Sequence, residues 1–219
     1  MNETAFDENA KKTKSGCLGK GCLIIIGLIV VLIAILTGGS FIGLKYGLTS
    51  AKPIELPAIV DSPEQQRVLT ERWNEFVKGS RENKASGSQQ PLSLQYTADD
   101  LNQLVSANRK ARGKGYLRID GNVGKLQVSF PLTKMPFRGQ FLNAECEVHS
   151  SPDRDPLKLK IEKLTVSGKA IPESALNVIF SGRSLTSYLQ QYINEYGVTG
   201  FAIENNTVVL ESGTKSAAK

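Results

Sequence analysis

Three ionisable side chains at alternate positions, Glu145, Glu147 and His149, have the clearest potential for chemistry in this chain. On an extended strand, residues two apart share one face with Cα atoms about 6.8 Å apart, so neighbouring side chains could clasp a cation. A second interpretation has more support, because Lys158 and Lys160 alternate in the next extended segment. We therefore expect Glu147 to lie opposite Lys158 or Lys160 as an ordinary cross-strand ion pair.

A second pair of carboxylates, Asp99 and Asp100, could perform acid–base chemistry, but their position favours a structural role. They follow Thr97 and Ala98 and precede an apolar helical pattern. Carboxylates in the first turn of a helix accept bonds from free backbone N–H groups and interact favourably with the helix dipole. We expect both residues to cap a helix.

The densest group of cations follows that helix and consists of Arg109, Lys110, Arg112 and Lys114. One interpretation is a contact with an anionic surface, either lipid headgroups or wall polymers. The other is a solvated helix end whose cations complement the dipole. The mild net positive charge beyond residue 46 gives no basis for expecting a nucleic acid as partner.

Recognisable catalytic motifs are missing from the sequence. It contains no G-x-S-x-G, Walker loop, H-E-x-x-H or C-x-x-C, and it has one His and three Cys. We therefore expect a non-enzymatic protein with no cofactor and no metal. Three cysteines also exclude a disulfide scaffold for a chain of 219 residues.

The elements that must position these residues begin with an amphipathic helix. Ser62–Gln65 supplies an N-cap, a proline at the first helical position and a capping-box glutamine. The helix is expected to end near Gly79, with residues 79–91 as a loop. Apolar residues at helical spacing form its buried face: Leu69, Trp73, Phe76 and Val77. Trp73 is expected to be a core anchor.

Short strands and further helices follow. A strand at 92–96 precedes the helix that bears Leu101, Leu104 and Val105. Alternation then predicts an antiparallel meander over 117–119, 126–132, 142–148 and 157–166, with a bulge at Lys163. Helices at 173–180 and 185–195 and a hairpin turning at Asn205-Asn206 complete the chain. The order of elements predicts an α+β fold with the helices on one face of the sheet.

The apolar face of this meander is the candidate ligand site. Its expected lining residues are Leu126, Val128, Phe130, Leu142 and Tyr188. They would either surround an apolar, lipid-like ligand or pack against one another as a solid core. The alternation of apolar and polar residues is the same for a ligand pocket and for a solid core, so it does not distinguish them.

One segment, Gly21–Leu44, contains no charged side chain. As a helix rising about 1.5 Å per residue it would extend about 36 Å, against a hydrocarbon core of about 30 Å. We predict a transmembrane helix over residues 21–45. The alternative is a signal peptide with Leu23–Leu36 as its apolar core and small residues at 37–40 as a cleavage site. The long polar leader and the apolar residues after position 40 favour a retained anchor.

The lysines that flank this segment indicate its orientation. Four precede it, Lys11, Lys12, Lys14 and Lys20, and Lys45 and Lys52 follow. This asymmetry favours a cytoplasmic N-terminus and an extracytoplasmic C-terminal part. Gly39, Gly43 and Gly47 form a GxxxGxxxG pattern that either packs two such helices into a homodimer or marks an unwinding helix end.

These observations divide the chain into five parts. They are a cytoplasmic tail at 1–20, a transmembrane helix at 21–45, a linker at 46–61, an extracytoplasmic α+β domain at 62–211 and a frayed tail at 212–219. A domain of about 150 residues buries roughly 68–70% of its unfolded surface and can fold without staples.

The order of parts resembles that of the YpmS-like family of bacterial membrane-anchored proteins. The resemblance covers about residues 20–211 and depends mainly on Thr97–Asn102, with Ile171-Pro172 opening a later helix. More remotely the chain is similar to tubular lipid-binding domains, in which a curved sheet wraps a helix around an apolar groove. The YpmS-like resemblance implies no catalytic residue.

The sequence thus predicts a single-pass cell-envelope protein whose outer domain binds an apolar or lipid-like ligand in envelope assembly or maintenance. Its expected partners are the bilayer and that ligand. Two alternatives remain. The outer domain could dock another envelope protein, or it could be a hydrolase whose site has no recognised motif.

Overall fold

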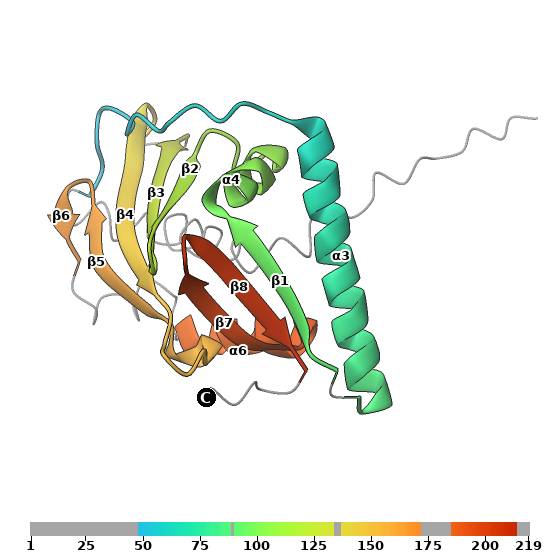
Figure 1. The fold of residues 1–219 in the computed structure, drawn as a ribbon. Helices are drawn as coiled ribbons and strands as arrows, with labels where there is room; N and C mark the ends of the chain where they lie inside the picture. The colour runs from blue at the N-terminus through green and yellow to red at the C-terminus, as the bar shows by residue number, and fades with distance from the viewer. Residues whose placement is uncertain (1–47, 89, 134–136, 172–184, 214–219) are drawn as a thin grey trace, which may run out of the picture.

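The structure is a computed structural model that describes residues 48–88, 90–133, 137–171 and 185–213. Within those ranges the chain has the predicted α+β architecture, with antiparallel sheets and helices (Figure 1). The apolar segment at 21–44 and Gly39, Gly43 and Gly47 lie outside the described residues. No helix in the described ranges combines the length and apolar character needed to cross a membrane.

The first helix, α3 (Pro63–Ser86), begins as predicted, with the Ser62 side chain accepting a bond from the Gln65 N–H. The predicted end near Gly79 and the loop after it are wrong, because the helix continues to Ser86 and ends at Gly87 with φ of 68°. A Cβ at Gly79 would lie 2.9 Å from Cδ1 of Leu92. Gly79 therefore permits close packing inside the helix rather than ending it.

Strand β1 (Leu92–Thr97) leads directly into α4 (Ala98–Ala107). The Asp100 N–H donates to Thr97 Oγ1 at 3.1 Å, and the Thr97 N–H donates to Asp100 Oδ2 at 3.0 Å. This reciprocal capping box confirms the structural role of Asp100. Asp99 also lies in the first turn of α4.

The predicted meander is present, and with one further strand, β6, it forms a five-stranded sheet in the spatial order β2-β3-β4-β5-β6. Its strands are β2 (Gly115–Asp120), β3 (Val123–Leu132), β4 (Gln140–His149), β5 (Lys160–Val166) and β6 (Lys169–Ala170). The predicted bulge is confirmed, because Glu145 pairs with Thr165 whereas Glu147 pairs with Glu162, and Lys163 has φ of 50°. The strand does not begin at Leu157 as expected, because residues 156–158 form a 3₁₀ turn, η2 (Pro156–Lys158).

A second sheet has the order β1-β8-β7, with β7 (Val198–Glu204) and β8 (Thr207–Ser212) forming the predicted hairpin. Its turn residues, Asn205 and Asn206, have φ of 51° and 62°, the left-handed values that a tight hairpin needs. Helix α6 (Leu185–Tyr196) precedes the hairpin. The pairing of β1 with β8 is not evident from the sequence.

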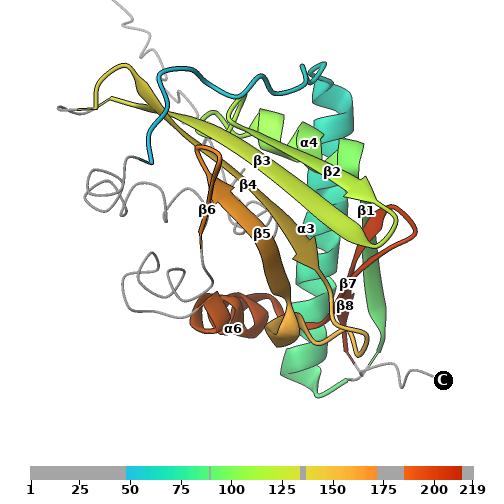
Figure 2. The same cartoon turned by 90° about the vertical axis from the view of Figure 1, so that its left-hand side faces the viewer.

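The two sheets and the helices share one hydrophobic core. Seen from the side, the five-stranded sheet lies in front of α3 (Figure 2). Trp73 is a core anchor as predicted, with its ring centroid 5.8 Å from that of Tyr196. Turns link the sheets, since the Asn206 N–H donates to the Gly121 carbonyl at 2.9 Å.

The segment expected to be a linker is described from Leu48 to Asp61, and we call this part the strap. Ser50 and Phe141 exchange two backbone bonds of 2.8 Å, which attach the beginning of the strap to β4. At the other end, the Gln103 side chain donates to the Val60 carbonyl at 2.6 Å. The strap therefore crosses one end of the five-stranded sheet, the strap end, where β3 finishes and β4 starts (Figure 1).

Candidate functional site

The inner apolar face of the meander brings together four of the five predicted lining residues. Leu126 pairs with Cys146, Val128 with Ala144, and Phe130 with Leu142, so their side chains share one face. Leu126, Val128 and Leu142 are 3%, 0% and 7% exposed. The fifth, Tyr188, belongs to α6, but its side chain lies outside the described part of the structure.

The burial of this face decreases toward the strap end. Phe130, Leu132 and Leu48 are only half-buried, and all three pack against the core cluster. Lys114 Nζ lies 5.5 Å from the centroid of the Phe130 ring, a cation–π arrangement. A fully buried apolar surface therefore continues into a partly exposed one at the end where the strap crosses.

Cys146 lies on the inner face and is buried. Burial raises the pKa of the Cys146 thiol to about 12, with a smaller contribution from the charge of Glu147. A thiol in this state carries almost no thiolate at neutral pH and is a poor nucleophile. The inner face therefore offers apolar contact rather than reactivity.

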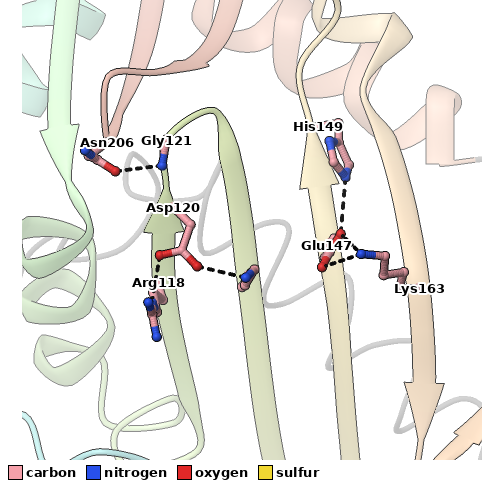
Figure 3. Close-up of polar contacts among 8 residues, drawn as sticks. Arg118, Asp120, Gly121, Glu147, His149, Lys163 and Asn206 are labelled. Carbon is pink, nitrogen blue, oxygen red and sulfur yellow. Dashed lines mark hydrogen bonds and ion pairs between the residues drawn. The ribbon is translucent and has the colours of Figure 1, made fainter.

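The outer face of the same sheet carries Glu145, Glu147 and His149 of β4. The predicted pairing of Glu147 with Lys158 or Lys160 is wrong, because its cross-strand partner is Glu162. Lys163, which the bulge turns toward the outer face, instead places Nζ 2.9 Å from Glu147 Oε2 (Figure 3). The resulting hydrogen bond from Lys163 holds the pKa of Glu147 below its ordinary value.

The two lysines take other partners. Lys158 lies in η2 rather than in a strand, and its ammonium pairs with Asp153 and, at 4.0 Å, with Asp155. Lys160 lies opposite His149. The hydrogen bond with Asp153 raises the pKa of Lys158 and holds that of Asp153 well below its usual range.

His149 approaches two carboxylates without bonding to either. Its Nε2 lies 3.6 Å from Glu147 Oε2 and 3.7 Å from Glu162 Oε2, and it is a buried atom without a hydrogen-bond partner among the described residues. Glu145 accepts from Gln127 instead. Over the described ranges, no three His, Cys, Asp or Glu side chains are arranged to hold a metal ion.

A second group on the outer face consists of Arg118, Asp120 and Lys125 on the β2–β3 hairpin. Asp120 accepts hydrogen bonds from Lys125 Nζ at 2.8 Å and from Arg118 Nε at 2.9 Å. Figure 3 shows Arg118 beside Asp120. The bond from Lys125 is the main reason that the pKa of Asp120 is lowered. The Asp120 carboxylate is therefore shared between two cations.

The basic cluster is divided between engaged and exposed side chains. Arg112 Nε donates to the Ser106 carbonyl at 2.6 Å, and Lys114 Nζ donates to the Lys110 carbonyl at 2.9 Å. The side chains of Arg109 and Lys110 are exposed. The cluster occupies the turn between α4 and β2. Strand β2 begins at the strap end.

Two structurally important residues were missed by sequence reasoning. Arg154, between β4 and η2, pairs with Glu211 and places Nη2 2.9 Å from Glu204 Oε1, so it attaches the 150–155 connection to the β7–β8 hairpin. Asn102 of α4 bonds both the N–H and the carbonyl of Leu117 at the edge of β2. Both contacts depend on tertiary structure, and neither residue stands in a local pattern that would identify it.

Comparisons with known proteins add no assignment to this geometry. A scan against protein-family models, a search of curated proteins and a search of solved structures each gave no match to this chain.

Proposed function

We propose that this chain is a single-pass membrane protein of the cell envelope whose α+β part lies outside the cytoplasm and binds an apolar, lipid-like ligand. The segment 21–44 serves as the anchor, with the N-terminus in the cytoplasm. The protein acts in envelope assembly or maintenance without catalysing a reaction. Membership of the YpmS-like family, suggested by Thr97–Asn102, is part of this proposal.

The observation that carries the proposal is the gradient of burial along the inner face. Val128 at mid-sheet is 0% exposed, whereas Phe130 and Leu132 nearer the strap end are half-buried. Apolar side chains that remain partly exposed to solvent at one end of a core are suited to bind an acyl chain. We infer that the acyl chain lies against Phe130, Leu132 and Leu48.

Burial of apolar surface would favour such a contact. Each methylene removed from water contributes about 0.8 kcal/mol, so five or six methylenes against this surface would contribute about 4–5 kcal/mol before the cost of ordering the chain. The outer face, with its paired charges, offers no comparable apolar area. The ligand is therefore assigned to the inner face and its strap end.

The proposal is tested by native mass spectrometry of the full chain, released from the membrane in a mild detergent with its co-purifying lipids. We expect a lipid adduct on the wild type and a loss of about tenfold or more in Phe130→Asn, because a polar amide would replace the aromatic contact surface. Leu92→Asn is the matched control, since Leu92 is also a half-buried apolar residue in a strand, on β1.

Equal adduct on Phe130→Asn and wild type would contradict the site. The absence of any adduct on the wild type would contradict the function. Circular dichroism of both variants checks that each is folded as the wild type is, so that a lost adduct is not read from an unfolded chain.

A further inference from the structure

The strap end of the molecule gathers cations from three separate segments of the chain. Lys52 on the strap, Arg109 and Lys110 in the α4–β2 turn, and Arg138 before β4 are all exposed. Arg112 and Lys114 belong to the same turn. The acidic side chains on the strap and at the start of α3 are Glu55, Asp61 and Glu64, and Asp61 lies 3.7 Å from Arg112. Asp100 also lies near the start of α3, because its Oδ1 accepts from Gln65 at 3.2 Å. Within the α4–β2 turn itself, every charged side chain is positive.

A chain of hydrogen bonds through β3 and β4 connects the basic turn with the strap. The Ser129 N–H donates to the Lys114 carbonyl at 2.8 Å, and Ser129 Oγ is 2.8 Å from Asn143 Oδ1. Asn143 Nδ2 in turn donates to the Lys52 carbonyl at 2.8 Å. Two strands, β3 and β4, thus lie between the basic turn and the strap, a separation of about 14 Å in a sheet.

Chain length fixes where the proposed anchor must join this surface. Leu44 is the last residue of the apolar segment, and Leu48 begins the strap. Four residues of fully extended chain reach about 14 Å at most. The Leu48 carbonyl accepts from Ser167 Oγ, so the strap is already bound to the sheet at its first described residue. An anchor ending at Leu44 would hold the strap end close to the bilayer.

We propose that the strap end rests on anionic phospholipid headgroups of the membrane that holds the anchor, with Arg109 and Lys110 as the principal contacts. This inference rests on the proposed membrane anchor and adds to it a lipid class and an orientation. Electrostatic attraction to anionic headgroups decays within a Debye length, about 8–10 Å at physiological salt, and the short tether keeps the exposed cations near that range. The half-buried Phe130 and Leu132 then face the same membrane.

The test uses the full chain reconstituted in two kinds of vesicle, phosphatidylcholine alone and phosphatidylcholine mixed with phosphatidylglycerol. Amide hydrogen exchange is followed in peptides that cover residues 48–61 and 105–115. We expect exchange in both regions to be about threefold or more slower in the mixed vesicles, with the difference reduced at high salt. Arg109→Gln/Lys110→Gln should abolish the difference.

The matched control is Lys78→Gln/Arg81→Gln, which removes the same charge from exposed positions of α3 and should leave the difference intact. Equal exchange in the two vesicle types, or a difference that survives in the Arg109/Lys110 variant, would overturn the inference. Flotation with neutral vesicles separates the two proposals. A chain that fails to float contradicts the anchor, whereas one that floats without the lipid-dependent protection contradicts only the headgroup contact.

Discussion

At the scale of single residues, the side chains that organise this molecule belong to unremarkable positions in the sequence. Asn102 is 3% exposed, and its side-chain amide makes the two hydrogen bonds that a neighbouring strand would make with the edge of β2. Its Nδ2 donates to the Leu117 carbonyl at 2.8 Å and its Oδ1 accepts from the Leu117 N–H at 2.9 Å. One amide therefore satisfies two backbone groups that would otherwise be left at a sheet edge.

Asn102→Ala should lower the free energy of unfolding by about 2–4 kcal/mol, because it leaves both Leu117 groups without their partner. Urea denaturation monitored by circular dichroism measures the change. Asn194→Ala, at an exposed position in α6, is the control and should cost under about 0.5 kcal/mol. Equal effects of the two substitutions would show that the edge contact contributes nothing.

Glu147 gives a prediction about pH. Its pKa is lowered below the ordinary value of 4.5, chiefly by the hydrogen bond from Lys163. A depressed folded-state pKa means that this contribution to stability is complete above the unfolded pKa and is lost as the pH falls through the folded one. Lys163→Gln should therefore flatten the decline in stability below about pH 5.

The carboxyl carbon of Glu147, followed by NMR through an acid titration, measures this directly. Its midpoint should move upward toward the ordinary value in Lys163→Gln and stay in place in Lys78→Gln, whose lysine is on α3. A Glu147 midpoint that is the same in Lys163→Gln and wild type would show that the ion pair is not formed in solution.

At the scale of elements, local sequence signals identified most helices and strands and misplaced the contacts between them. The N-cap at Ser62, the capping box at Thr97 and the Asn205-Asn206 turn are local signals, and each element that they predict is present. The predicted helix end at Gly79 was wrong because a glycine can either end a helix or permit close packing inside one. Only the position of Leu92 in the fold distinguishes the two roles.

The pairing of β1 with β8 and the partner of Glu147 were not predictable for related reasons. Thr97 lies opposite Thr207, a pairing between distant parts of the sequence that no short-range pattern encodes. The register before the bulge places Lys160 opposite His149 and Glu162 opposite Glu147, and it is set by the connection between β4 and β5. The bulge then turns the side chain of Lys163 toward the outer face, where it reaches Glu147.

The junction between α6 and β7 gives the prediction for this scale. Gly197 has φ of 64°, and a Cβ there would lie 2.3 Å from Ser80 Oγ. Ser80 is buried, donates to the Tyr196 carbonyl at 2.7 Å and contacts Ser212 Oγ at 2.6 Å. The glycine thus lets α3, α6 and β8 meet at one point.

Gly197→Ala should destabilise the protein by about 3 kcal/mol or more, since the left-handed conformation costs about 1–2 kcal/mol and the clash displaces Ser80. Gly87→Ala is the control, because Gly87 also has a positive φ, 68°, but has open space around its Cα. Gly87→Ala should lower the free energy of unfolding only by the cost of the left-handed conformation, about 1–2 kcal/mol. Thermal or urea unfolding of both variants compares them, and equal losses would refute the role of the Ser80 contact.

At the scale of the whole molecule, the sequence predicted which residues share the face of the candidate site but not how deeply each of them is buried. Alternation placed Leu126, Val128, Phe130 and Leu142 on one face, which the strand register confirms. Periodicity reports which residues share a face and says nothing about how deeply each is buried. The gradient from Val128 to Phe130 is a property of the tertiary packing, as is the attachment of the strap to β4 through Ser50, and no sequence pattern indicates either.

We propose that the inner face takes an acyl chain from the membrane at its strap end. The most direct measurement incorporates a phospholipid with a photoactivatable acyl chain into membranes that hold the full chain, and then maps crosslinked peptides by mass spectrometry. We predict crosslinks in β3 and β4 near Phe130 and Leu142, strongly reduced in Phe130→Asn and retained in Leu92→Asn. Crosslinks confined to residues 21–44, with none in β3 or β4, would contradict it.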